Sequence, residues 1–406
     1  MICVRKIREA FPIYKNHPQL VYLDSAASAL KLNKVKESIN YYYDNLNTNV
    51  YRGDYDLGYQ TTTLFEATRE EVAQFINADK QEIVFTKGTT EGINLVANHF
   101  SSILKEGDEI IISELEHHAN FIPWQIVAKK TKATIKYVKL TKEGRITVAN
   151  FLAVLSDKTK IVALNYVSNV MGYLTPLREI IMLAHEKKAR VLIDAAQAAP
   201  HFKLDVKALK VDYLAFSSHK MFGPTGVGIL YLNEQTHQET IPFEYGGEMV
   251  LKVDKESAIF KDAPYKFEAG TPPIEGVIAF KEAIKFFNKL DYSSIREHTK
   301  MLHEYTLKKL KELKEVKVYN PHNEIGLITF NIDGVHPHDA MTIFAKNKVY
   351  LRAGQHCAEP ITKFLGEMAT LRASFHIYND FNDCDKLVAS IKETIAFFKQ
   401  FRGEKK

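Results

Sequence analysis

The chain has 406 residues, of which 46% are hydrophobic and 25% are charged, and its formal net charge is +5. This composition is typical of globular proteins and excludes disordered and fibrous classes. The length suits two domains better than one simple core. The charges are interspersed apart from a short basic end at Arg402–Lys406, and no basic stripe with interleaved aromatic residues indicates nucleic-acid binding.

The three cysteines Cys3, Cys357 and Cys384 are far apart in the sequence and odd in number. This pattern predicts neither a disulfide framework nor a metal-binding cluster, and it fits a reducing cytosol. The N-terminal residues are charged and contain no apolar core of signal-peptide length, and no apolar run approaches the length of a membrane span. We therefore expect a cytoplasmic protein that binds no metal, nucleic acid or membrane.

Apolar runs typical of strands alternate with helical patterns from about residue 82 to residue 232. The expected strands are 82–86, 109–113, 135–138, 161–166, 191–194, 213–216 and 228–232. Residues with helical periodicity fill most of the gaps, for example over 91–100 and 177–187. The alternation predicts an α/β fold with a mostly parallel, seven-stranded sheet and helices on both faces.

The sequence pattern changes after Gly270–Pro273. A helical stretch over 276–313 with a break near Asp291 precedes the expected strands 327–332 and 371–375, and the expected helices 338–346 and 383–401. This second part predicts a smaller α+β domain. We therefore divide the chain into an N-terminal segment 1–17 that packs with the small domain, a large domain 18–288 and a small C-terminal domain 289–406.

Two chemically paired residues follow neighbouring apolar runs. Asp194 ends the run 191–194, and Lys220 follows the run 213–216. Ligands of parallel sheets bind at the carboxyl ends of the strands, where both residues fall. A pyridoxal phosphate (PLP) site needs a lysine that holds the aldehyde and a carboxylate that keeps the pyridine nitrogen protonated. An isolated pair of this kind is more often structural, so other residues of the chain must distinguish a PLP site from a structural ion pair.

The turn Thr86–Gly92 lies between an expected strand and an expected helix. Free amides and the helix dipole favour an anion there, which suits a cofactor phosphate bound near Thr89 and Thr90. Ser217 and His219 precede the lysine and are candidates for further phosphate contacts. The alternative is a simple helix cap, because Thr and Ser are good capping residues.

Further candidates surround this pair. The segment Glu116–Asn120 contains two adjacent histidines. Adjacent side chains point apart, and no carboxylate has the spacing of a metal ligand, so a metal site is not indicated. We interpret His117 as a ring stacked on the cofactor or, alternatively, as a surface histidine. Gln197 follows Asp194 closely and suits a donor to the cofactor's phenolic oxygen. Arg372 lies on an apolar run and suits bidentate binding of a carboxylate, although a salt bridge is the commoner role.

Cys357 indicates the type of reaction. It lies in Arg352–Pro360, a loop-like segment bounded by Gly and Pro. The positive and polar neighbours Arg352 and His356 favour a thiolate. A buried, inert cysteine is the usual interpretation, and we keep it for Cys3 and Cys384.

Together these segments resemble the type II cysteine desulfurases of the SUF iron–sulfur assembly system, which are selenocysteine lyase-like enzymes of class V within the fold-type I PLP enzymes. The resemblance covers essentially the whole chain. It rests on segments that match in order, namely 22–28, 88–97, 116–120, 167–170, 194–197, 218–220, 223–226, 267–272 and the Cys357 loop. The short Arg-x-Gly-x-His-Cys loop favours type II over the NifS-like type I enzymes, whose cysteine lies on a longer, Ser-rich loop.

The resemblance implies a role for each candidate. Lys220 would be the Schiff-base lysine, Asp194 the pyridinium partner, Gln197 the phenolate donor and His117 the stacking group, while Thr89, Thr90, Ser217 and His219 would bind the phosphate. Thr271 would reach the phosphate of a second subunit, which implies a homodimer. Arg372 and Asn169 would hold the substrate carboxylate, with Arg352 near the nucleophile.

The reaction implied is the conversion of L-cysteine to L-alanine. Lys220 would remove the α-proton, Cys357 would attack the substrate sulfur and keep it as a persulfide, and His117 would shuttle protons. A sulfur acceptor of the SufE or SufU type would then take the sulfur. His338 resembles a histidine that takes over a zinc ligand position when a SufU-type partner docks.

Two positions depart from the family pattern. Gln355 stands where a further histidine is common, and Tyr51 stands where many relatives have His. We expect both near the cofactor or substrate, where they would alter turnover or the choice between sulfur and selenium. The alternatives are another class V enzyme, such as an aminotransferase or a kynureninase-like hydrolase, and a PLP-binding scaffold or sulfur-relay component with little turnover. Neither class V alternative needs Cys357.

Overall fold

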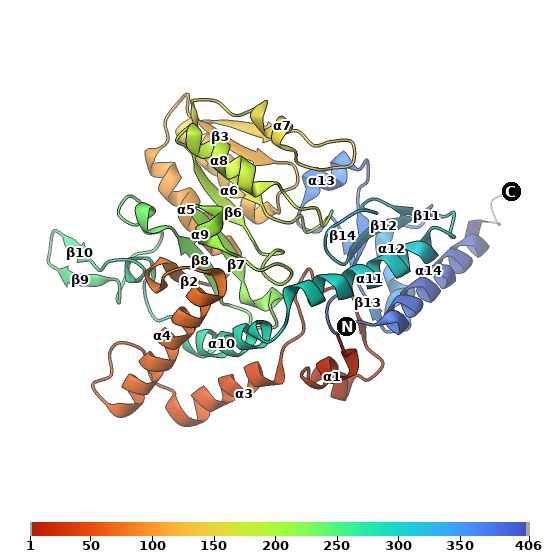
Figure 1. The fold of residues 1–406 in the computed structure, drawn as a ribbon, viewed down its shortest axis with the longest axis horizontal. Coiled ribbons are helices and arrows are strands. Elements are labelled where there is room, and N and C mark those ends of the chain that lie inside the picture. The colour runs from red at the N-terminus through yellow and green to blue at the C-terminus, as the bar shows by residue number, and fades with distance from the viewer. Residues whose placement is uncertain (1, 403–406) are drawn as a thin grey trace.

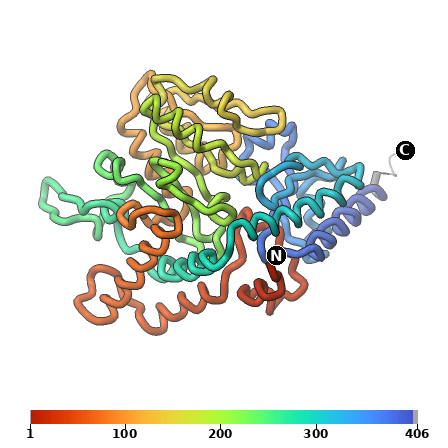
Figure 2. The backbone as a smooth tube through the Cα atoms, in the orientation of Figure 1, coloured from red at the N-terminus to blue at the C-terminus, as the bar shows by residue number. Residues whose placement is uncertain are grey.

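The computed structural model describes residues 2–402, with side chains described to residue 400. Its elements gather around two sheets, a large one within residues 83–232 and a smaller one within residues 316–374 (Figure 1). Figure 2 shows the chain passing between the two regions along α10 (Ile274–Asn288) and α11 (Tyr292–Leu310). Asp291 begins α11 because its carboxylate accepts hydrogen bonds from the backbone N–H groups of Ser293 and Ser294. The predicted break near Asp291 is confirmed.

The large sheet has seven strands in the order β2-β8-β7-β6-β5-β3-β4. They are β2 (Ile83–Thr86), β3 (Glu109–Ser113), β4 (Thr134–Val138), β5 (Thr159–Asn165), β6 (Arg190–Asp194), β7 (Tyr213–Ser217) and β8 (Gly228–Leu232). All neighbours run parallel except that β8 is antiparallel to both β2 and β7. The predicted mostly parallel, seven-stranded sheet is therefore confirmed.

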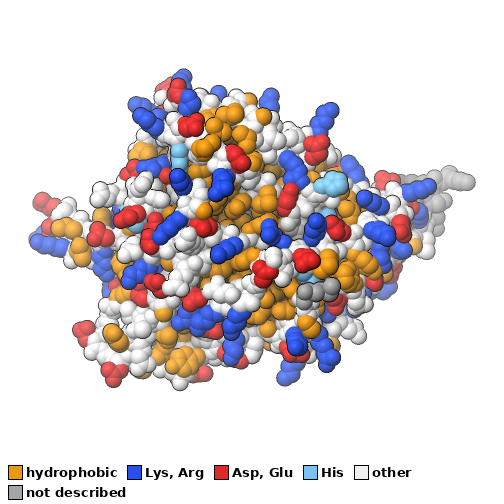
Figure 3. All heavy atoms as spheres, viewed as in Figure 1, with side chains coloured by type: hydrophobic (Ala, Val, Ile, Leu, Met, Phe, Trp, Pro, Cys, Tyr) orange, Lys and Arg blue, Asp and Glu red, His pale blue; other side chains and the backbone are white. Residues whose placement is uncertain are grey.

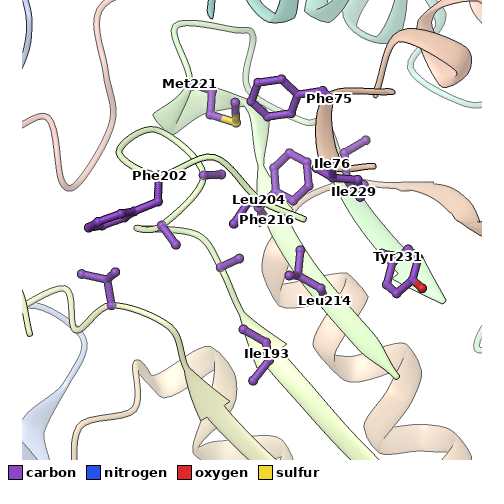
Figure 4. Close-up of a cluster of buried hydrophobic side chains, with 14 of the residues drawn as sticks. Phe75, Ile76, Ile193, Phe202, Leu204, Leu214, Phe216, Met221, Ile229 and Tyr231 are labelled. Atoms are coloured by element: carbon purple, nitrogen blue, oxygen red, sulfur yellow. The ribbon is translucent and has the colours of Figure 1, made fainter. Parts of the chain in front are cut away.

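Helices cover both faces of this sheet, which explains why its strands are apolar at consecutive positions. Successive strand residues point to opposite faces, so Leu192 packs with α5 and α6, whereas Ile193 packs with α4, α8 and α10. Figure 4 shows part of the Ile193 cluster, in which Phe216 lies near Ile76 of α4, and Leu214 and Ile193 lie further along the sheet. The helices here are α3 (Asn33–Tyr41), α4 (Asp56–Ile76), α5 (Thr89–Ile103), α6 (Ile122–Thr131), α7 (Val148–Leu152), α8 (Leu177–Glu186) and α9 (Val206–Leu209).

The smaller sheet is antiparallel, in the order β11-β12-β15-β14, and packs against α11, α12 and α14. Its region comprises β11 (Val316–Val318), β12 (Leu327–Ile332), α12 (Pro337–Lys346), β13 (Val349–Tyr350), β14 (Arg352–Gly354), α13 (Glu359–Phe364), β15 (Thr370–Ser374) and α14 (Phe381–Arg402). The short β1 (Val21–Tyr22) pairs in parallel with β13, and Val21 and Leu23 are buried in this second core. The division of the chain at residues 17 and 288 stays a prediction.

The first helices, α1 (Val4–Glu9) and α2 (Ile13–Asn16), lie at the junction of the two regions. Arg8 donates hydrogen bonds to the Tyr378 carbonyl and to Asp383 Oδ2, both at 2.7 Å. Phe11 packs edge-on against Phe222 of the large region, with ring centroids 5.2 Å apart. The N-terminal segment therefore packs into the core of the large region and binds Asp383 of α14 in the smaller region.

Positive and negative side chains are interspersed on the face drawn in Figure 3. The hairpin β9 (Val250–Val253) and β10 (Ala258–Phe260) projects from the large region (Figure 1) and exposes apolar side chains such as Leu251. Over residues 2–402, no helix combines the length and the apolar character that a membrane span requires.

Candidate active site

A cavity of about 240 Å³ lies where the carboxyl ends of β5, β6 and β7 meet the start of α5 and the loop after β14. Strand ends of this kind are the usual ligand sites of parallel sheets. The cavity is lined by Ala26, Ala27, Thr89, Thr90, His117, Ala119, Asn165, Val167, Asn169, Asp194, Ala196, Gln197, Ser217, His219, Lys220, Arg352, His356, Cys357 and Arg372. It thus gathers every residue predicted for cofactor, substrate or nucleophile except Thr271.

Asp194 and Lys220 are two oppositely charged residues in the lining of this cavity. Asp194 ends β6 and accepts a hydrogen bond from the Ala196 N–H at 2.9 Å. Burial raises the pKa of Asp194, and Lys220 lowers it in opposition. Burial lowers the pKa of Lys220 to about 8, although Asp194 raises it in opposition. The amine is therefore far more readily neutral, and so nucleophilic, than an exposed lysine.

The part of the cavity at the start of α5 suits an anion. Thr89 begins α5, a helix of 15 residues whose first turn presents backbone N–H groups and the positive end of the helix dipole. The Ser217 hydroxyl accepts from the Thr89 N–H at 2.8 Å and lies 2.6 Å from the Thr89 hydroxyl. Gly228 allows this turn to approach β8, because a Cβ there would lie 2.4 Å from Gly88 Cα.

His117 and Gln197 also line this cavity. His117 follows β3, and its Nδ1 accepts a hydrogen bond from the Ala119 N–H at 3.1 Å. Burial, followed by the charge of Lys220, lowers the pKa of His117 to about 3, so this imidazole is neutral at pH 7. Gln197 donates from Nε2 to the Ala26 carbonyl at 2.7 Å, which fixes the orientation of its amide.

Arg372 enters the cavity from β15. Its side chain is buried, and it donates from Nη1 to the Asn169 carbonyl at 2.9 Å and from Nη2 to Asp24 Oδ1 at 3.2 Å. Burial lowers the pKa of Arg372 to about 10, so the guanidinium stays charged at pH 7. Its Nε is buried and has no hydrogen-bond partner among residues 2–402. An anionic ligand would supply the partner that this donor lacks.

Cys357 lies at the mouth of the cavity with its side chain exposed. Arg352 Nη2 lies 3.9 Å from Cys357 Sγ, so a positive charge stands beside the sulfur. His356 and Cys357 both adopt left-handed backbone conformations, with φ values of 55° and 54°. Such conformations cost about 1–2 kcal/mol per non-glycine residue, so the loop needs contacts that hold it.

Several residues fall elsewhere. Thr271 is exposed in the loop before α10, outside this cavity, and its role toward a second subunit stays a prediction. His338 is exposed on α12 beside Gly354, where an added Cβ would lie 3.8 Å from His338 Nε2. Tyr51 lies away from this cavity, where its hydroxyl donates to Glu66, and Gln355 is exposed beside the Cys357 loop.

The sequence interpretation missed three residues that serve the site. Asp24 anchors Arg372. Glu116 is fully buried and accepts hydrogen bonds from Ser113, Asn120 and Asn165 at 2.6, 2.7 and 2.9 Å. An acidic residue beside apolar runs was the available signal for Asp24 and Glu116. Asn165, paired with Asp194 across β5 and β6, carried no comparable signal.

The residues present fit PLP. A lysine with a lowered pKa, a buried carboxylate and an anion site at a helix N-terminus line one cavity, and a neutral imidazole lies among them. When bound, PLP supplies an electron sink for charge that develops at a substrate carbon. Fold and cavity together define a PLP-dependent enzyme of fold-type I.

Comparisons with known proteins agree with this class. The class-V aminotransferase family matches residues 21–387. A probable cysteine desulfurase of Halalkalibacterium halodurans is 45% identical over 398 residues, which cover 97% of this chain and 98% of that protein. A solved cysteine desulfurase from Escherichia coli has a TM-score of 0.91 at 37% identity and covers 98% of this chain and 99% of its own. One from Thermococcus onnurineus has a TM-score of 0.93 at 34% identity, over 98% of both chains. The chain therefore belongs to the class-V aminotransferase family and, within it, to the cysteine desulfurases.

Proposed function

We propose that this protein converts L-cysteine to L-alanine and retains the sulfur as a persulfide on Cys357. The observation that carries the proposal is that Cys357 and Lys220 line the same cavity. A class V aminotransferase or hydrolase needs the lysine but has no use for a thiol at that mouth. Arg352, with Nη2 3.9 Å from Sγ, places a positive charge beside the atom that would receive the substrate sulfur.

We assign the cofactor contacts to residues that line the cavity. Lys220 Nζ would hold the aldehyde, Asp194 would keep the pyridine nitrogen protonated, and Gln197 would donate to the phenolic oxygen. Thr89, Thr90, Ser217 and His219 would hold the phosphate at the start of α5. The neutral ring of His117 would stack on the pyridine ring.

We assign substrate binding to Arg372 of the small region and Asn169 of the large region. Arg372 would hold the carboxylate of L-cysteine with its buried guanidinium, and its unpartnered Nε supports this role. Asn169, bonded to Arg372 through its carbonyl, would line the same pocket. The substrate's α-carbon would then lie between Lys220 and Cys357, within reach of both.

The chain's own groups complete the chemistry. Lys220 would accept the proton from the substrate α-carbon. The Cys357 thiolate would attack the substrate sulfur and form an S–S bond as the Cβ–S bond breaks. The electron pair of the broken bond stays with the carbon side, which takes up one proton at Cβ, regains one at the α-carbon and leaves as alanine. Cys357 keeps the sulfur as a persulfide, and His117 serves as a proton shuttle.

The proposal extends to partners. We infer a cytoplasmic homodimer in which Thr271 reaches the second site, and a SufE- or SufU-type acceptor that carries sulfur to iron–sulfur cluster assembly by a SUF system. The exposed position of His338 beside Gly354 supports a docking contact near Cys357. Selenocysteine lyase activity at the same thiol is a second candidate, because selenium would leave the substrate carbon by the same attack.

The test is the release of alanine from L-cysteine by purified, PLP-loaded protein under reductant, with Cys357→Ala alongside. We expect alanine and matching sulfide from the natural chain and neither from the variant. Selenocysteine and SufE- or SufU-type acceptors are then added in turn, and His338→Ala tests the SufU contact. Without alanine from the natural chain, even with acceptors present, the function is another class V reaction.

A further inference from the structure

His118 contacts the loop that carries the nucleophile. The backbone N–H of His118 donates to the Cys357 carbonyl at 2.7 Å. The imidazole Nε2 of His118 accepts a hydrogen bond from the backbone N–H of Glu359 at 3.1 Å. One residue of the large region therefore holds Cys357 itself and the start of α13, two residues further along.

These bonds fall where the loop backbone needs support. His356 and Cys357 are consecutive residues in the left-handed region, which is costly for both. The His356 carbonyl accepts from Asn169 Nδ2 at 2.8 Å, and the Cys357 carbonyl accepts from His118. Both left-handed residues are thus held from the large region.

The turn that carries His118 is itself fixed. The buried carboxyl of Glu116 accepts hydrogen bonds from Ser113 at the end of β3, from Asn120 and from Asn165 at the end of β5. His117, between Glu116 and His118, lines the cavity. The turn therefore joins the sheet, the cofactor cavity and the Cys357 loop through consecutive residues.

We propose that His118 is a positioning residue that holds the Cys357 loop so that Sγ stays beside Arg352 and faces the substrate sulfur. The inference deepens the proposed function and rests on it. His118 acts through an unprotonated Nε2, since only a lone pair accepts from the Glu359 N–H. The adjacent histidines thus have different tasks, with His117 at the cofactor and His118 at the nucleophile loop.

The test compares His118→Ala with His118→Gln, because glutamine places an acceptor near the position of Nε2. In His118→Ala we expect kcat for alanine formation to fall about tenfold, the range of one neutral hydrogen bond, with KM for L-cysteine nearly unchanged. His118→Gln is expected to recover most of the rate. Exposed His17→Ala is the matched control and keeps the natural rate.

A second readout needs no turnover. In a Cys3→Ser background, where buried Cys384 and exposed Cys357 are the remaining thiols, iodoacetamide alkylation reports on Cys357. A loosened loop separates the exposed Sγ from Arg352, so the alkylation rate of His118→Ala at pH 7 should differ several-fold from that of the natural chain. His118→Gln should alkylate at nearly the natural rate. Glu359→Pro removes the backbone N–H that donates to His118 and should change the alkylation rate to the same extent.

The outcomes separate the two proposals. If the natural chain forms no alanine, the proposed function fails, while the alkylation rates still decide the role of His118. If His118→Ala has the same alkylation rate and the same kcat as the natural chain, the inference is wrong. Equal losses in His118→Gln and His118→Ala would also overturn it, because the acceptor would then not be the cause. If His118→Ala does not fold, as judged by its thermal unfolding, Glu359→Pro decides by the same two measures.

Discussion

Arg372 and Asp24 are joined by a hydrogen bond of 3.2 Å from Nη2 to Oδ1, although the two residues come from opposite ends of the sequence. The bond, together with the one to the Asn169 carbonyl, fixes the plane of the guanidinium at the cavity wall. A planar, oriented guanidinium discriminates carboxylates by geometry as well as by charge. The proposed binding of the substrate carboxylate by Arg372 therefore depends on a contact between two segments that lie far apart in the sequence.

Replacing Arg372 with Lys tests this role. An ammonium keeps the charge but loses the fork that reaches Asn169, Asp24 and a carboxylate together. We expect KM for L-cysteine to rise by about 10- to 100-fold with a smaller change in kcat. Steady-state kinetics measure both values, and exposed Arg296→Lys serves as the control. An unchanged KM would show that the carboxylate is bound elsewhere.

Lys220 determines how cofactor loading depends on pH. An amine reacts with an aldehyde only when it is neutral, and the pKa of Lys220 is lowered to about 8 from 10.5. In the cofactor-free protein, the rate of PLP attachment should rise through a midpoint near pH 8. Absorbance after mixing measures the rate, with free N-acetyl-lysine as the reference. Because Asp194 raises this pKa, Asp194→Asn should move the midpoint to lower pH. A rate still climbing at pH 10 contradicts the prediction.

Glu116 makes stability depend on pH. Burial raises the pKa of Glu116 to about 8, while the unfolded chain has the ordinary 4.5. Between these values the unfolded state loses a proton that the folded state keeps, so this group's stabilising contribution is full below pH 4.5 and is lost as pH rises toward 8. The slope approaches about 1.4 kcal/mol per pH unit. Glu116→Gln removes this dependence.

Urea unfolding of the natural chain and Glu116→Gln at pH 5, 6, 7 and 8 checks that prediction. The free energies of unfolding of the two proteins should diverge as the pH rises, with the variant gaining relative to the natural chain. Exposed Glu256→Gln provides the control. Parallel curves for Glu116→Gln would mean that the carboxyl ionises normally in the fold.

Gly228 tests the anion end of the cavity. Alanine at this position would place Cβ 2.4 Å from Gly88 Cα, and backbone on both sides must shift. We expect a loss of about 1–3 kcal/mol in the free energy of unfolding together with weaker PLP binding. Exposed Gly246→Ala meets its nearest neighbour at 3.8 Å and should change neither. Calorimetry and cofactor titration give the two values.

The sequence allowed the large sheet and the core of the site to be predicted, because both depend on local patterns. Strand ends of a parallel sheet converge, so Asp194 and Lys220 could be brought together from their apolar runs alone. The strand expected over 161–166 starts at Thr159 instead, because polar Thr159 pairs with Glu109, the first residue of β3. Strand boundaries depend on such neighbours, which periodicity does not contain.

The contacts that orient the reactive groups could not be predicted. The bond from His118 to Cys357 joins segments whose relative placement depends on how the two cores pack. The bond from Arg372 to Asp24 joins two segments of the second core that lie far apart in the sequence. Tyr51 shows the same limit, because its hydroxyl donates to Glu66 in a cluster around buried Arg69, outside this chain's own cavity, and its expected place near the cofactor or substrate stays a prediction for a second subunit's site. The residue type at position 51 indicated a polar role but not the hydrogen-bond partner of the hydroxyl.

The pairing of β1 with β13 has a consequence for synthesis on the ribosome. Val21 and Leu23 emerge early, yet the strand and the apolar cluster that receive them form only after residue 349 and its neighbours have been made. The early segment must wait, with its apolar side chains uncovered, for almost the entire period of translation. The smaller region, which carries Cys357, is therefore the last part of the protein to be assembled.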